Sequence, residues 1–557
     1  MSTPSVLEIS EDISARNPSL RASRRPIRPA SPAERIQFSA RSKSTPLKHY
    51  WSFCSTAGRA NEGLREGWRE HLRLTVKHCG IRRLRFHGLF HDDMFACRRN
   101  GSGELVFNFQ YIDELFDALL AANVRPFVEF GFFPKDLAPA SDIRCFWWQA
   151  HVTPPEDLRE WSHLVESAVA HFIQRYGREE VRSWYFEVWN EPNLWFFFNA
   201  TKSKYFELYR ATALAVKGVD RELKVGGPAT SNFVPDDRFD GEQQEGHKAI
   251  THQLEDLGKV EWRGVWIEEF LDYCAKEGLP VDFVSTHPYP TDIPFGHDVT
   301  GMRTRASDAT LSDLKWLRRA IDQSAFPSAE IHLTEWSTSP SARDFTHDYP
   351  QSAAYILKTN IAAAGLVDSL AYWTFTDVFE EHGAGDAAFH GGFGLINYQG
   401  IVKPAFHAYR FLNQLGTEEI FRSDGFLATR SKDRDHVRAV ICHYPDQYPG
   451  SPRFAMSMEE AEKILAIGQP ATQSILIHDL PPNTPYLVET VDAEHGFAVR
   501  AWQAMGQPQS PSPDQLTLLR DLGWATRREI INVNDAGLLH LELKLSPWAI
   551  ALIREMA

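Results

Sequence analysis

The sequence contains few cysteines and none of the cysteine patterns that hold a metal ion or a disulfide framework. Its 557 residues include six cysteines, at positions 54, 79, 97, 145, 274 and 442. They form no C-x-x-C pair and stand at no metal-ligand spacing from a histidine. We expect reduced, mostly buried thiols, with no metal site and no cofactor. The 22 histidines raise the alternative of a metal-dependent hydrolase, but no His-x-His or His-Glu-x-x-His pattern accompanies them.

Long apolar runs and an excess of positive charge are also absent. No segment reaches the roughly 20 apolar residues that span a bilayer, and the N-terminus lacks the apolar stretch of a secretory signal. We therefore expect a cytoplasmic protein that does not bind a membrane. The net charge of -14 and the pI near 5.9 provide no basic surface for nucleic acid. A small oligosaccharide fits better as the partner, and the oligomeric state stays open between a monomer and a homo-oligomer.

Aromatic residues, by contrast, are plentiful. They make up 12% of the chain and include 16 tryptophans. Their flat apolar faces can stack on the C–H faces of sugars, although we expect most of the rings in the core. With 43% hydrophobic residues, the chain can bury a large core and form a barrel with a smaller second domain.

The composition divides the chain into three regions. Residues 1–46 are rich in serine, proline and arginine, which predicts a flexible tail that contributes one strand, near Ile36–Phe38, to a sheet elsewhere. Residues 47–400 alternate short apolar runs with amphipathic segments. Residues 401–557 predict a β-sandwich accessory domain that supports the barrel, with carbohydrate binding as the alternative role. The strand candidates in this last region are Phe426–Thr429, Val437–Cys442, Gln473–Ile477, Tyr486–Thr490 and Leu538–Leu543.

The region 47–400 predicts a (β/α)8 barrel, an α/β fold. Its eight predicted strands are His49–Phe53, Arg83–Phe86, Pro126–Phe130, Trp184–Trp189, Lys224–Gly227, Asp282–Thr286, Glu330–Thr334 and Ser369–Phe375. Its predicted helices are Glu62–Lys77, Tyr111–Ala121, Asp157–Tyr176, Lys204–Lys217, Val265–Lys276, Asp308–Ile321 and Ala353–Ala364. Such alternation over one continuous segment is typical of this barrel. A doubly wound open sheet is the alternative, but no G-x-G-x-x-G follows the first strand.

A long polar segment, residues 229–264, interrupts the barrel after the fifth predicted strand. Connections of this length are usually functional or disordered. The segment is expected on the face of the barrel where the strands end. It therefore either shapes the entrance to a site or is a solvated insertion.

Polar side chains follow five of the eight predicted strands. Active-site groups of (β/α)8 barrels stand at the carboxyl ends of the strands. The candidates at these ends are His87, Asn190, Glu191, His287, Tyr289, Glu335, Glu380 and Glu381. A shared site explains this convergence better than five unrelated polar positions do.

Two glutamates follow the fourth and seventh predicted strands. Glu191 lies in Trp-Asn-Glu-Pro-Asn, and Glu335 lies in Leu-Thr-Glu-Trp. Cleavage of a glycosidic bond needs a proton donor and a carboxylate that stabilises an oxocarbenium-like centre. Across the mouth of a barrel this pair can supply both, and Asn190 is placed to bond a sugar 2-hydroxyl group. Spacing in the sequence does not separate a retaining reaction from an inverting one.

Longer motifs around these residues resemble glycoside hydrolase family 39, and within it the bacterial β-xylosidases. The motifs are Arg-Phe-His-Gly-Leu-Phe-His-Asp-Asp (85–93), Ile-Asp-Glu-Leu-Phe-Asp-Ala-Leu-Leu (112–120), Arg-Pro-Phe-Val-Glu-Phe-Gly-Phe (125–132), Phe-Glu-Val-Trp-Asn-Glu-Pro-Asn-Leu (186–194), Val-Gly-Gly-Pro-Ala (225–229), His-Leu-Thr-Glu-Trp (332–336), Tyr-Trp-Thr-Phe-Thr-Asp-Val-Phe-Glu-Glu (372–381) and Phe-His-Gly-Gly-Phe-Gly-Leu (389–395). The resemblance runs from about residue 48 to the C-terminus. Asn-Glu-Pro alone marks the wider clan, whereas the motifs at 85–93 and 372–395 are more specific.

The resemblance implies a retaining exo-β-D-xylosidase that releases xylose from the non-reducing ends of xylooligosaccharides. It implies that Glu191 is the acid/base, that Glu335 is the nucleophile and that Trp373 forms part of the pocket floor. The other residues implied in the pocket are His87, Asn190, His287, Tyr289, Glu380 and Glu381. The alternatives are another exo-glycosidase, such as an α-L-iduronidase or α-L-arabinosidase, and a sugar-binding barrel without activity. A uronate requires a nearby cation, whereas these strand ends are acidic, and a degenerate barrel normally lacks one of the two carboxylates.

Overall fold

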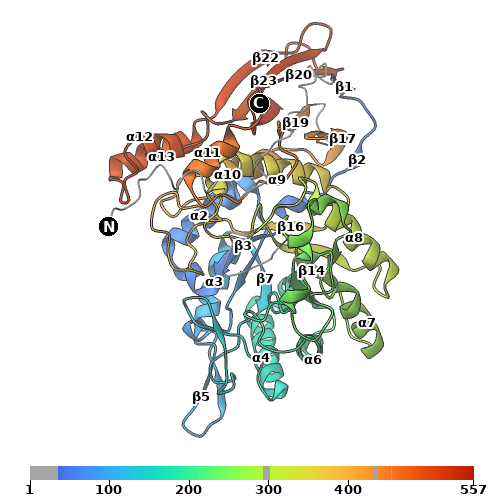
Figure 1. The fold of residues 1–557 in the computed structure, drawn as a ribbon, viewed down its shortest axis with the longest axis vertical. Helices are drawn as coiled ribbons and strands as arrows, with labels where there is room; N and C mark the ends of the chain where they lie inside the picture. The colour runs from blue at the N-terminus through green and yellow to red at the C-terminus, as the bar shows by residue number, and fades with distance from the viewer. Residues whose placement is uncertain (1–34, 293–301, 432–435, 453, 557) are drawn as a thin grey trace, which may run out of the picture.

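The computed structural model describes residues 35–292, 302–431, 436–452 and 454–556 (Figure 1). The predicted flexible tail falls mainly on residues 1–34, which lie outside these ranges. Eight parallel strands form one sheet in the order β16-β15-β14-β11-β10-β7-β4-β3. They are β3 (Ser55–Arg59), β4 (Arg83–His87), β7 (Arg125–Phe130), β10 (Tyr185–Val188), β11 (Lys224–Ser231), β14 (Phe283–His287), β15 (Glu330–Trp336) and β16 (Ser369–Tyr372). The edge strands meet where Thr56 Oγ1 donates to the carbonyl oxygen of Tyr372 at 2.7 Å, so the sheet is a nearly closed barrel, as the alternation predicts.

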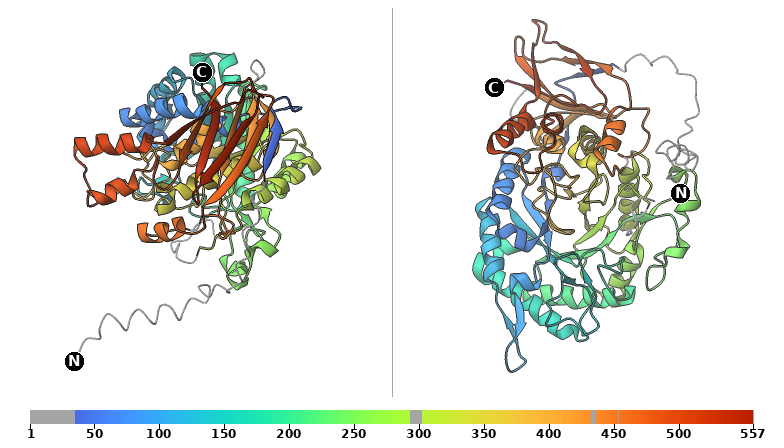
Figure 2. Two further views of the ribbon diagram at one scale, coloured as in Figure 1. Left: turned by 90° about the horizontal axis from the view of Figure 1, so that it is seen from above. Right: turned by 60° about the vertical axis from the view of Figure 1, so that its left-hand side comes forward.

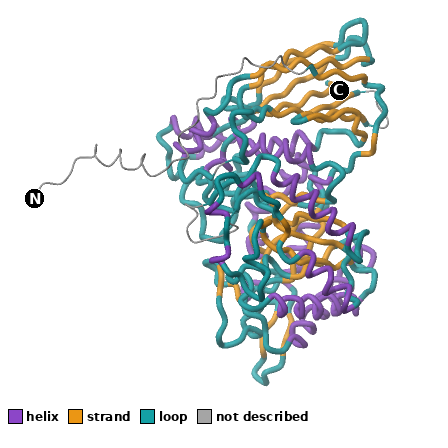
Figure 3. The backbone as a smooth tube through the Cα atoms, turned by 45° about the vertical axis from the view of Figure 1, so that its right-hand side comes forward, coloured by secondary structure: helices purple, strands orange, loops and turns teal. Residues whose placement is uncertain are grey.

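Helices surround this barrel, and the strands lie inside their ring (Figure 3). They are α2 (Glu66–Cys79), α3 (Gln110–Ala121), α4 (Leu158–Tyr176), α5 (Arg178–Arg182), α6 (Lys202–Val219), α7 (Ile267–Glu277), α8 (Ala309–Gln323), α9 (Pro350–Ala362) and α10 (Pro404–Leu412). Local sequence sets several ends: the Asp157 side chain caps α4, and Gly80 ends α2 in the left-handed conformation that favours glycine. Helix α10 packs beside α9 and α2 and begins after residue 400, the predicted end of the barrel region.

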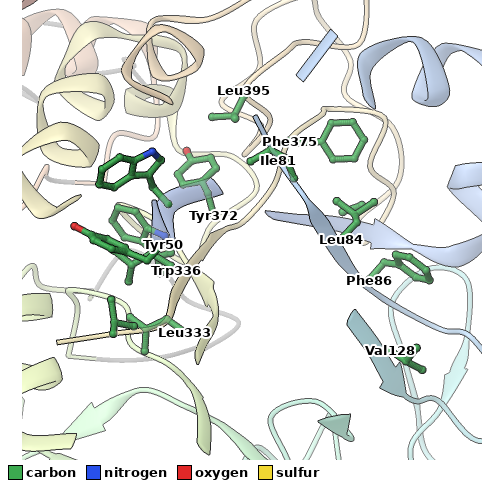
Figure 4. Packing of buried hydrophobic residues seen from close by; sticks show 14 of the residues in the cluster. Tyr50, Ile81, Leu84, Phe86, Val128, Leu333, Trp336, Tyr372, Phe375 and Leu395 are labelled. Atoms are coloured by element: carbon green, nitrogen blue, oxygen red, sulfur yellow. The ribbon is translucent and has the colours of Figure 1, made fainter. Parts of the chain in front are cut away.

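The prediction of a first strand at His49–Phe53 is wrong. Tyr50–Ser52 is the 3-10 helix η2, and the first barrel strand is β3, with the sequence Ser-Thr-Ala-Gly-Arg. The rings at the start of this segment are buried against β16 instead, and Figure 4 shows Tyr50 grouped with Trp336 and Tyr372 beside that strand. Small residues form β3 because space beside it is limited: a Cβ on Gly58 would lie 2.5 Å from a carboxyl oxygen of Glu62. Burial of an apolar run therefore did not require a strand.

The barrel interior is built in layers. Near the amino ends of the strands, the rings of Phe127, Tyr185 and Phe283 lie with their centroids 5.1 to 5.5 Å apart. Residues two apart on a strand point to the same side of the sheet. Two positions further along, β7 and β10 therefore place Glu129 and Glu187 in the interior, and these two residues are register partners. An aromatic layer thus lies directly beneath a layer of charged side chains.

Two more sheets lie at the other end of the molecule (Figure 2). One has the order β2-β17-β18-β19-β24-β21-β22 and the other β1-β20-β23. Their strands are β1 (Ile36–Ser39), β2 (Thr45–Pro46), β17 (Glu418–Ser423), β18 (Phe426–Arg430), β19 (Val437–Cys442), β20 (Ala471–His478), β21 (Pro485–Val491), β22 (Arg527–Asn532), β23 (Leu539–Leu545) and β24 (Ile550–Glu555). The sheets share one core, in which Ile477 and Leu541 belong to the smaller sheet and Val488 and Ile553 to the larger. Strand β1, at the segment where a strand is expected, pairs in parallel with β20.

Helices also interrupt the region after residue 400, where the sequence pattern predicts strands alone. They are α11 (Met458–Leu465), α12 (Val499–Ala504) and α13 (Pro513–Trp524). Each is short, and Ser512 with Gln515 forms a capping box at the start of α13. Among the described residues, no helix has the length and apolar character needed to cross a bilayer.

Short elements fill the loops of the barrel. Three antiparallel pairs are β5 (Cys97–Arg99) with β6 (Leu105–Phe107), β8 (Arg144–Cys145) with β9 (Ala150–His151), and β12 (Phe233–Val234) with β13 (Arg263–Gly264). The other 3-10 helices are η3 (Ala60–Leu64), η4 (Asp92–Met94), η5 (Gly246–Lys248), η6 (Thr251–Gln253), η7 (Leu257–Lys259) and η9 (Phe345–Asp348). In the segment 229–264, Arg238 is buried, pairs with Asp236 and donates to the carbonyl oxygen of Asp292 at 3.2 Å. The insertion is thereby attached to the loop that follows β14.

Candidate active site

The two candidate carboxyl groups meet inside the carboxyl end of the barrel. Glu191 follows β10 and Glu335 lies in β15, and both are buried, with 1% and 4% exposure. One carboxyl oxygen of each, together with a ring nitrogen of His287, lies within 4.8 Å of the others. Carboxyl groups of retaining glycosidases stand about 5–5.5 Å apart, whereas inverting enzymes leave about 6.5–9.5 Å for a water molecule. The close approach fits the retaining geometry.

The backbone of the Trp-Asn-Glu-Pro-Asn turn is strained. Trp189 and Glu191 have φ values of 73° and 45°, in the left-handed region that non-glycine residues rarely occupy. Neighbouring hydrogen bonds hold this turn against β11: the Glu191 amide donates to the carbonyl oxygen of Ala229 at 2.8 Å. The Asn193 side chain also bonds both the amide and the carbonyl group of Ser231. The turn thus directs Glu191 into the barrel rather than along the strand.

Glu335 is surrounded by hydrogen-bond donors. Arg85 Nη1 donates to its Oε1 at 2.7 Å, and the Tyr289 hydroxyl donates to its Oε2 at 3.0 Å. His87 Nε2 lies 3.5 Å from Oε1. These donors favour the ionised carboxylate.

Arg85 connects the site to the charged layer below. This fully buried guanidinium donates to Glu187 at 2.6 Å and to Asn190 Oδ1 at 2.8 Å, and lies 2.9 Å from Glu129. One cation therefore faces several carboxylates, and each needs Arg85 to compensate its burial. The bond to Asn190 also orients the side chain next to Glu191.

The environments of the two glutamates separate their pKa values. Burial, and then the charge of Glu335, raise the pKa of Glu191 well above its ordinary value. Burial also raises the pKa of Glu335, but Arg85 and His87 oppose this change. Glu191 is consequently the group that retains a proton and Glu335 the group that loses it, which is the division of roles that an acid and a nucleophile need.

His87, Trp373 and Glu381 lie beside Glu335. The His87 ring is 4.8 Å from the Trp373 ring, between centroids, and its Nε2 lies 3.8 Å from Glu381 Oε1. The Trp373 side chain is buried against Phe379. Burial and the charge of Glu335 raise the pKa of Glu381 well above its ordinary value. Neutral Glu381 can therefore donate one hydrogen bond to a hydroxyl group of a bound molecule and accept another from it.

Glu380, which is also predicted in the pocket, is held by two arginines. Its carboxylate forms ion pairs with Arg59 and Arg65. These arginines, led by Arg65, lower its pKa against the opposing effect of burial. The charge of Glu380 is thus neutralised, and its neighbour Glu381 lies close to His87, beside Glu335.

Sequence reasoning did not single out four residues of the site. Arg85, Glu129, Glu187 and Thr334 lie inside strands rather than at their ends. The first three could have been found as charged residues within apolar, β-prone runs, because a buried charge needs a partner. Thr334 has no such signal, since threonine is common in strands.

Glu191, His287 and Glu335 also form a group that could hold a metal ion, since each offers one ligand atom to a common centre. Two contacts favour a hydrogen-bonded cluster instead. His287 Nδ1 lies 2.9 Å from Glu191 Oε1, and its Nε2 lies 3.0 Å from Thr334 Oγ1. Both ring nitrogens are therefore already in hydrogen bonds.

A parallel eight-stranded barrel with this carboxyl pair at its fourth and seventh strands has the architecture of a glycoside hydrolase. The model of the family described as Glycosyl hydrolases family 39 matches residues 34–528, and the chain belongs to this family. The resemblance expected from the motifs is thereby confirmed.

Known relatives cover most of the chain. A protein named Beta-xylosidase from Geobacillus stearothermophilus is 37% identical over 516 residues, which are 91% of this chain and 92% of the relative. Another Beta-xylosidase, from Caldicellulosiruptor saccharolyticus, is 40% identical over 478 residues, with coverage of 84% and 87%. The crystal structure of the GH39 enzyme from Xanthomonas axonopodis pv. citri superposes with a TM-score of 0.80 at 32% identity, covering 94% of this chain and 97% of that one.

Proposed function

We propose that this protein is a retaining β-xylosidase that removes xylose from the non-reducing ends of xylooligosaccharides. The observation that carries the proposal is the approach of the Glu191 and Glu335 carboxyl groups to within 4.8 Å at the ends of β10 and β15. Relatives that cover more than four fifths of the chain and bear the name Beta-xylosidase support the choice of sugar.

In the first step, Glu335 attacks the anomeric carbon while Glu191 gives its proton to the glycosidic oxygen. The bond to the leaving group breaks, and a covalent xylosyl-enzyme forms at Glu335. Arg85 and Tyr289 hold the attacking carboxylate through their bonds to Oε1 and Oε2. Asn190, oriented by Arg85, is the donor for the sugar 2-hydroxyl group, a bond that strengthens in the transition state.

In the second step, Glu191 takes a proton from water as the water attacks the anomeric carbon and releases Glu335. Esterification has by then removed the negative charge of Glu335. That charge is one cause of the raised pKa of Glu191, so its loss favours the ionised Glu191 that acts as a base.

The polar groups of the pocket favour a neutral sugar. An α-L-iduronidase would need a free cation for the uronate, but Arg85 is taken up by Glu187 and Glu335, and Arg59 by Asp93 and Glu380. Glu381, kept neutral by its raised pKa, supplies no cation either. Xylose, which has no carboxylate and no hydroxymethyl group, suits this enclosed site. We further propose that His87, Tyr289, Trp373 and Glu381 line the subsite for the terminal xylose.

The two sheets at the far end are proposed to be a β-sandwich accessory domain. Their shared core, to which β1 from the N-terminal region contributes Ile36 and Phe38, supports this assignment. The larger sheet also packs against α9 and α10 of the barrel, which favours structural support over sugar binding.

A panel of aryl glycosides tests the proposed function. We expect hydrolysis of aryl β-D-xylosides, with slower or no reaction on α-L-arabinosides and α-L-iduronides. Proton NMR during the first seconds should show β-xylose as the first-formed anomer. First-formed α-xylose would contradict the retaining mechanism, and preference for an iduronide would contradict the substrate.

A further inference from the structure

A chain of buried hydrogen bonds runs from the charged layer of the barrel to Glu191. Thr334 Oγ1 donates to Glu187 Oε1 at 2.7 Å, His287 Nε2 lies 3.0 Å from the same Oγ1, and His287 Nδ1 lies 2.9 Å from Glu191 Oε1. Glu187, Thr334 and His287 have 0% exposure, so bulk solvent does not reach them. The direction of each bond can therefore be worked out from the groups themselves.

The donors and acceptors at Thr334 follow from the charge of Glu187. Arg85 Nε donates to Glu187 Oε2 at 2.6 Å, so Glu187 is the carboxylate of an ion pair and only accepts hydrogen bonds. The single hydroxyl proton of Thr334 is consequently used on Glu187. The Thr334 oxygen is then left to accept, and the donor that faces it is His287 Nε2–H.

The direction of the bond between His287 and Glu191 follows from the charge of His287. Burial, and then the charges of Arg85 and His87, lower the pKa of His287 well below its ordinary value, so the ring is neutral. A neutral imidazole with its proton on Nε2 has a bare Nδ1 that accepts. Glu335 Oε2 lies 3.7 Å from Nδ1 and already accepts the Tyr289 hydroxyl. Glu191 Oε1, at 2.9 Å, is therefore the donor and carries a proton.

We propose that Glu187 and Thr334 are positioning residues that fix the Nε2–H tautomer of His287 and thereby keep Glu191 protonated before each turnover. The inference rests on the proposed role of Glu191 as the acid/base. After Glu191 has passed its proton to the glycosidic oxygen, its carboxylate faces the lone pair of Nδ1 instead of an N–H group. His287 does not stabilise the carboxylate, so Glu191 remains a strong base that takes a proton from water in the second step.

Other charged and titratable groups also act on Glu191 and His287. They are Arg85 and His87 on β4, Glu129 on β7, Glu187 on β10, Tyr289 after β14, Glu335 on β15 and Glu381 after β16. Burial first, and then these charges, set the general level of the pKa of Glu191. The tautomer of His287 adds a separate contribution, because it decides whether a donor or a lone pair faces the carboxyl group at 2.9 Å.

Glu187→Gln provides a direct test because the substitution reverses the chain. With the amide oxygen accepting from Arg85, the amide nitrogen faces Thr334 and donates to its oxygen. The Thr334 hydroxyl then turns to His287 Nε2, and the ring proton moves to Nδ1. We expect nitrogen-15 NMR of histidine-labelled enzyme, with the His287 signals assigned by their loss in His287→Gln, to show Nε2–H in the wild type and Nδ1–H in Glu187→Gln.

Thr334→Val tests the consequence for catalysis. Without the acceptor, the Nδ1–H tautomer becomes available, donates to the Glu191 carboxylate and lowers its pKa. We expect the basic limb of the kcat/KM profile on an aryl xyloside with a poor leaving group to move down by about one pH unit. A dinitrophenyl xyloside, whose leaving group needs no proton, should show a loss of less than about threefold. Thr334→Ser keeps the hydroxyl group and should restore the profile.

Thr75→Val is the matched control, because Thr75 is a buried threonine on α2 that donates to the carbonyl oxygen of His71. Its profile should equal that of the wild type. An Nδ1–H tautomer in the wild type, an unchanged tautomer in Glu187→Gln, or an unmoved basic limb in Thr334→Val would overturn the inference. The NMR measurement needs no turnover. Failure to hydrolyse xylosides would contradict the proposed function, whereas the wrong tautomer of His287 would contradict only this inference.

Discussion

The interior of the barrel contains two adjacent layers made by the same strands. The lower layer is aromatic, with Phe127 on β7 and Tyr185 on β10, and the upper layer has Glu129 and Glu187 two residues further along. The lower layer is stabilised by burial and ring packing, which tolerate small shifts. The upper layer is a network of buried charges around Arg85, in which every group depends on a partner. A step of two residues therefore separates a layer held by apolar packing from a charged layer that holds the reacting groups.

The largest expected effect is the loss of the proposed nucleophile. Glu335→Ala should lower kcat by roughly 10³-fold or more, because no covalent intermediate can form. Added azide should restore turnover and yield α-xylosyl azide, whereas Glu191→Ala with azide should yield β-xylosyl azide. Activity near that of the wild type in Glu335→Ala would remove Glu335 from the mechanism.

Loss of Arg85 should affect both stability and activity. Arg85→Met leaves the carboxylates of Glu129, Glu187 and Glu335 without their shared cation, and removing one partner of buried ion pairs costs about 3–5 kcal/mol. Urea denaturation should show this decrease in the free energy of unfolding. Arg318→Met, which breaks an exposed pair with Asp322, should cost less than about 1 kcal/mol.

A change in the aromatic layer should lower stability and spare the chemistry. Phe283→Ala creates a cavity next to Phe127 and should cost about 3–5 kcal/mol in the free energy of unfolding. At a temperature where the variant is fully folded, its kcat should stay within about threefold of the wild type. A tenfold drop in kcat with unchanged stability would contradict the separation of the two layers.

A smaller effect, on stability alone, is considered for Glu191→Gln. The change in stability should depend on pH. The folded-state pKa of Glu191 is raised above the ordinary value of 4.5, so above pH 4.5 the unfolded chain loses this proton while the folded protein retains it. The wild type therefore loses stability as the pH rises through this window. Glutamine does not ionise, and its amide can donate to His287 Nδ1. We expect the Tm of Glu191→Gln to exceed that of the wild type at pH 7, with the difference disappearing towards pH 4.5.

The smallest expected effect is that of metal removal. If the group of Glu191, His287 and Glu335 works through hydrogen bonds alone, dialysis against EDTA should leave kcat/KM unchanged within error. A loss that zinc or another divalent cation restores would show that this group is a metal site.

The sequence by itself determined the barrel and the carboxyl pair. Alternation of apolar runs and amphipathic segments is a local property, and it located seven of the eight strands near their observed positions. Glu191 and Glu335 were identifiable because their motifs follow two of these strands. Spacing in the sequence left the retaining geometry open, and only the family resemblance implied it. The structure brings the two carboxyl groups within 4.8 Å.

Tertiary structure decided the features that depend on distant partners. The first strand is Ser55–Arg59 rather than the apolar run before it, because space beside β4 and Glu62 selects small residues. Glu380 pairs with Arg59 and Arg65, which lie more than 300 positions before it in the chain. The hydrogen bond between Thr334 and Glu187 joins residues 147 positions apart. Local sequence patterns predict which elements form. The burial of charged groups and the direction of hydrogen bonds are decided only when distant strands come together.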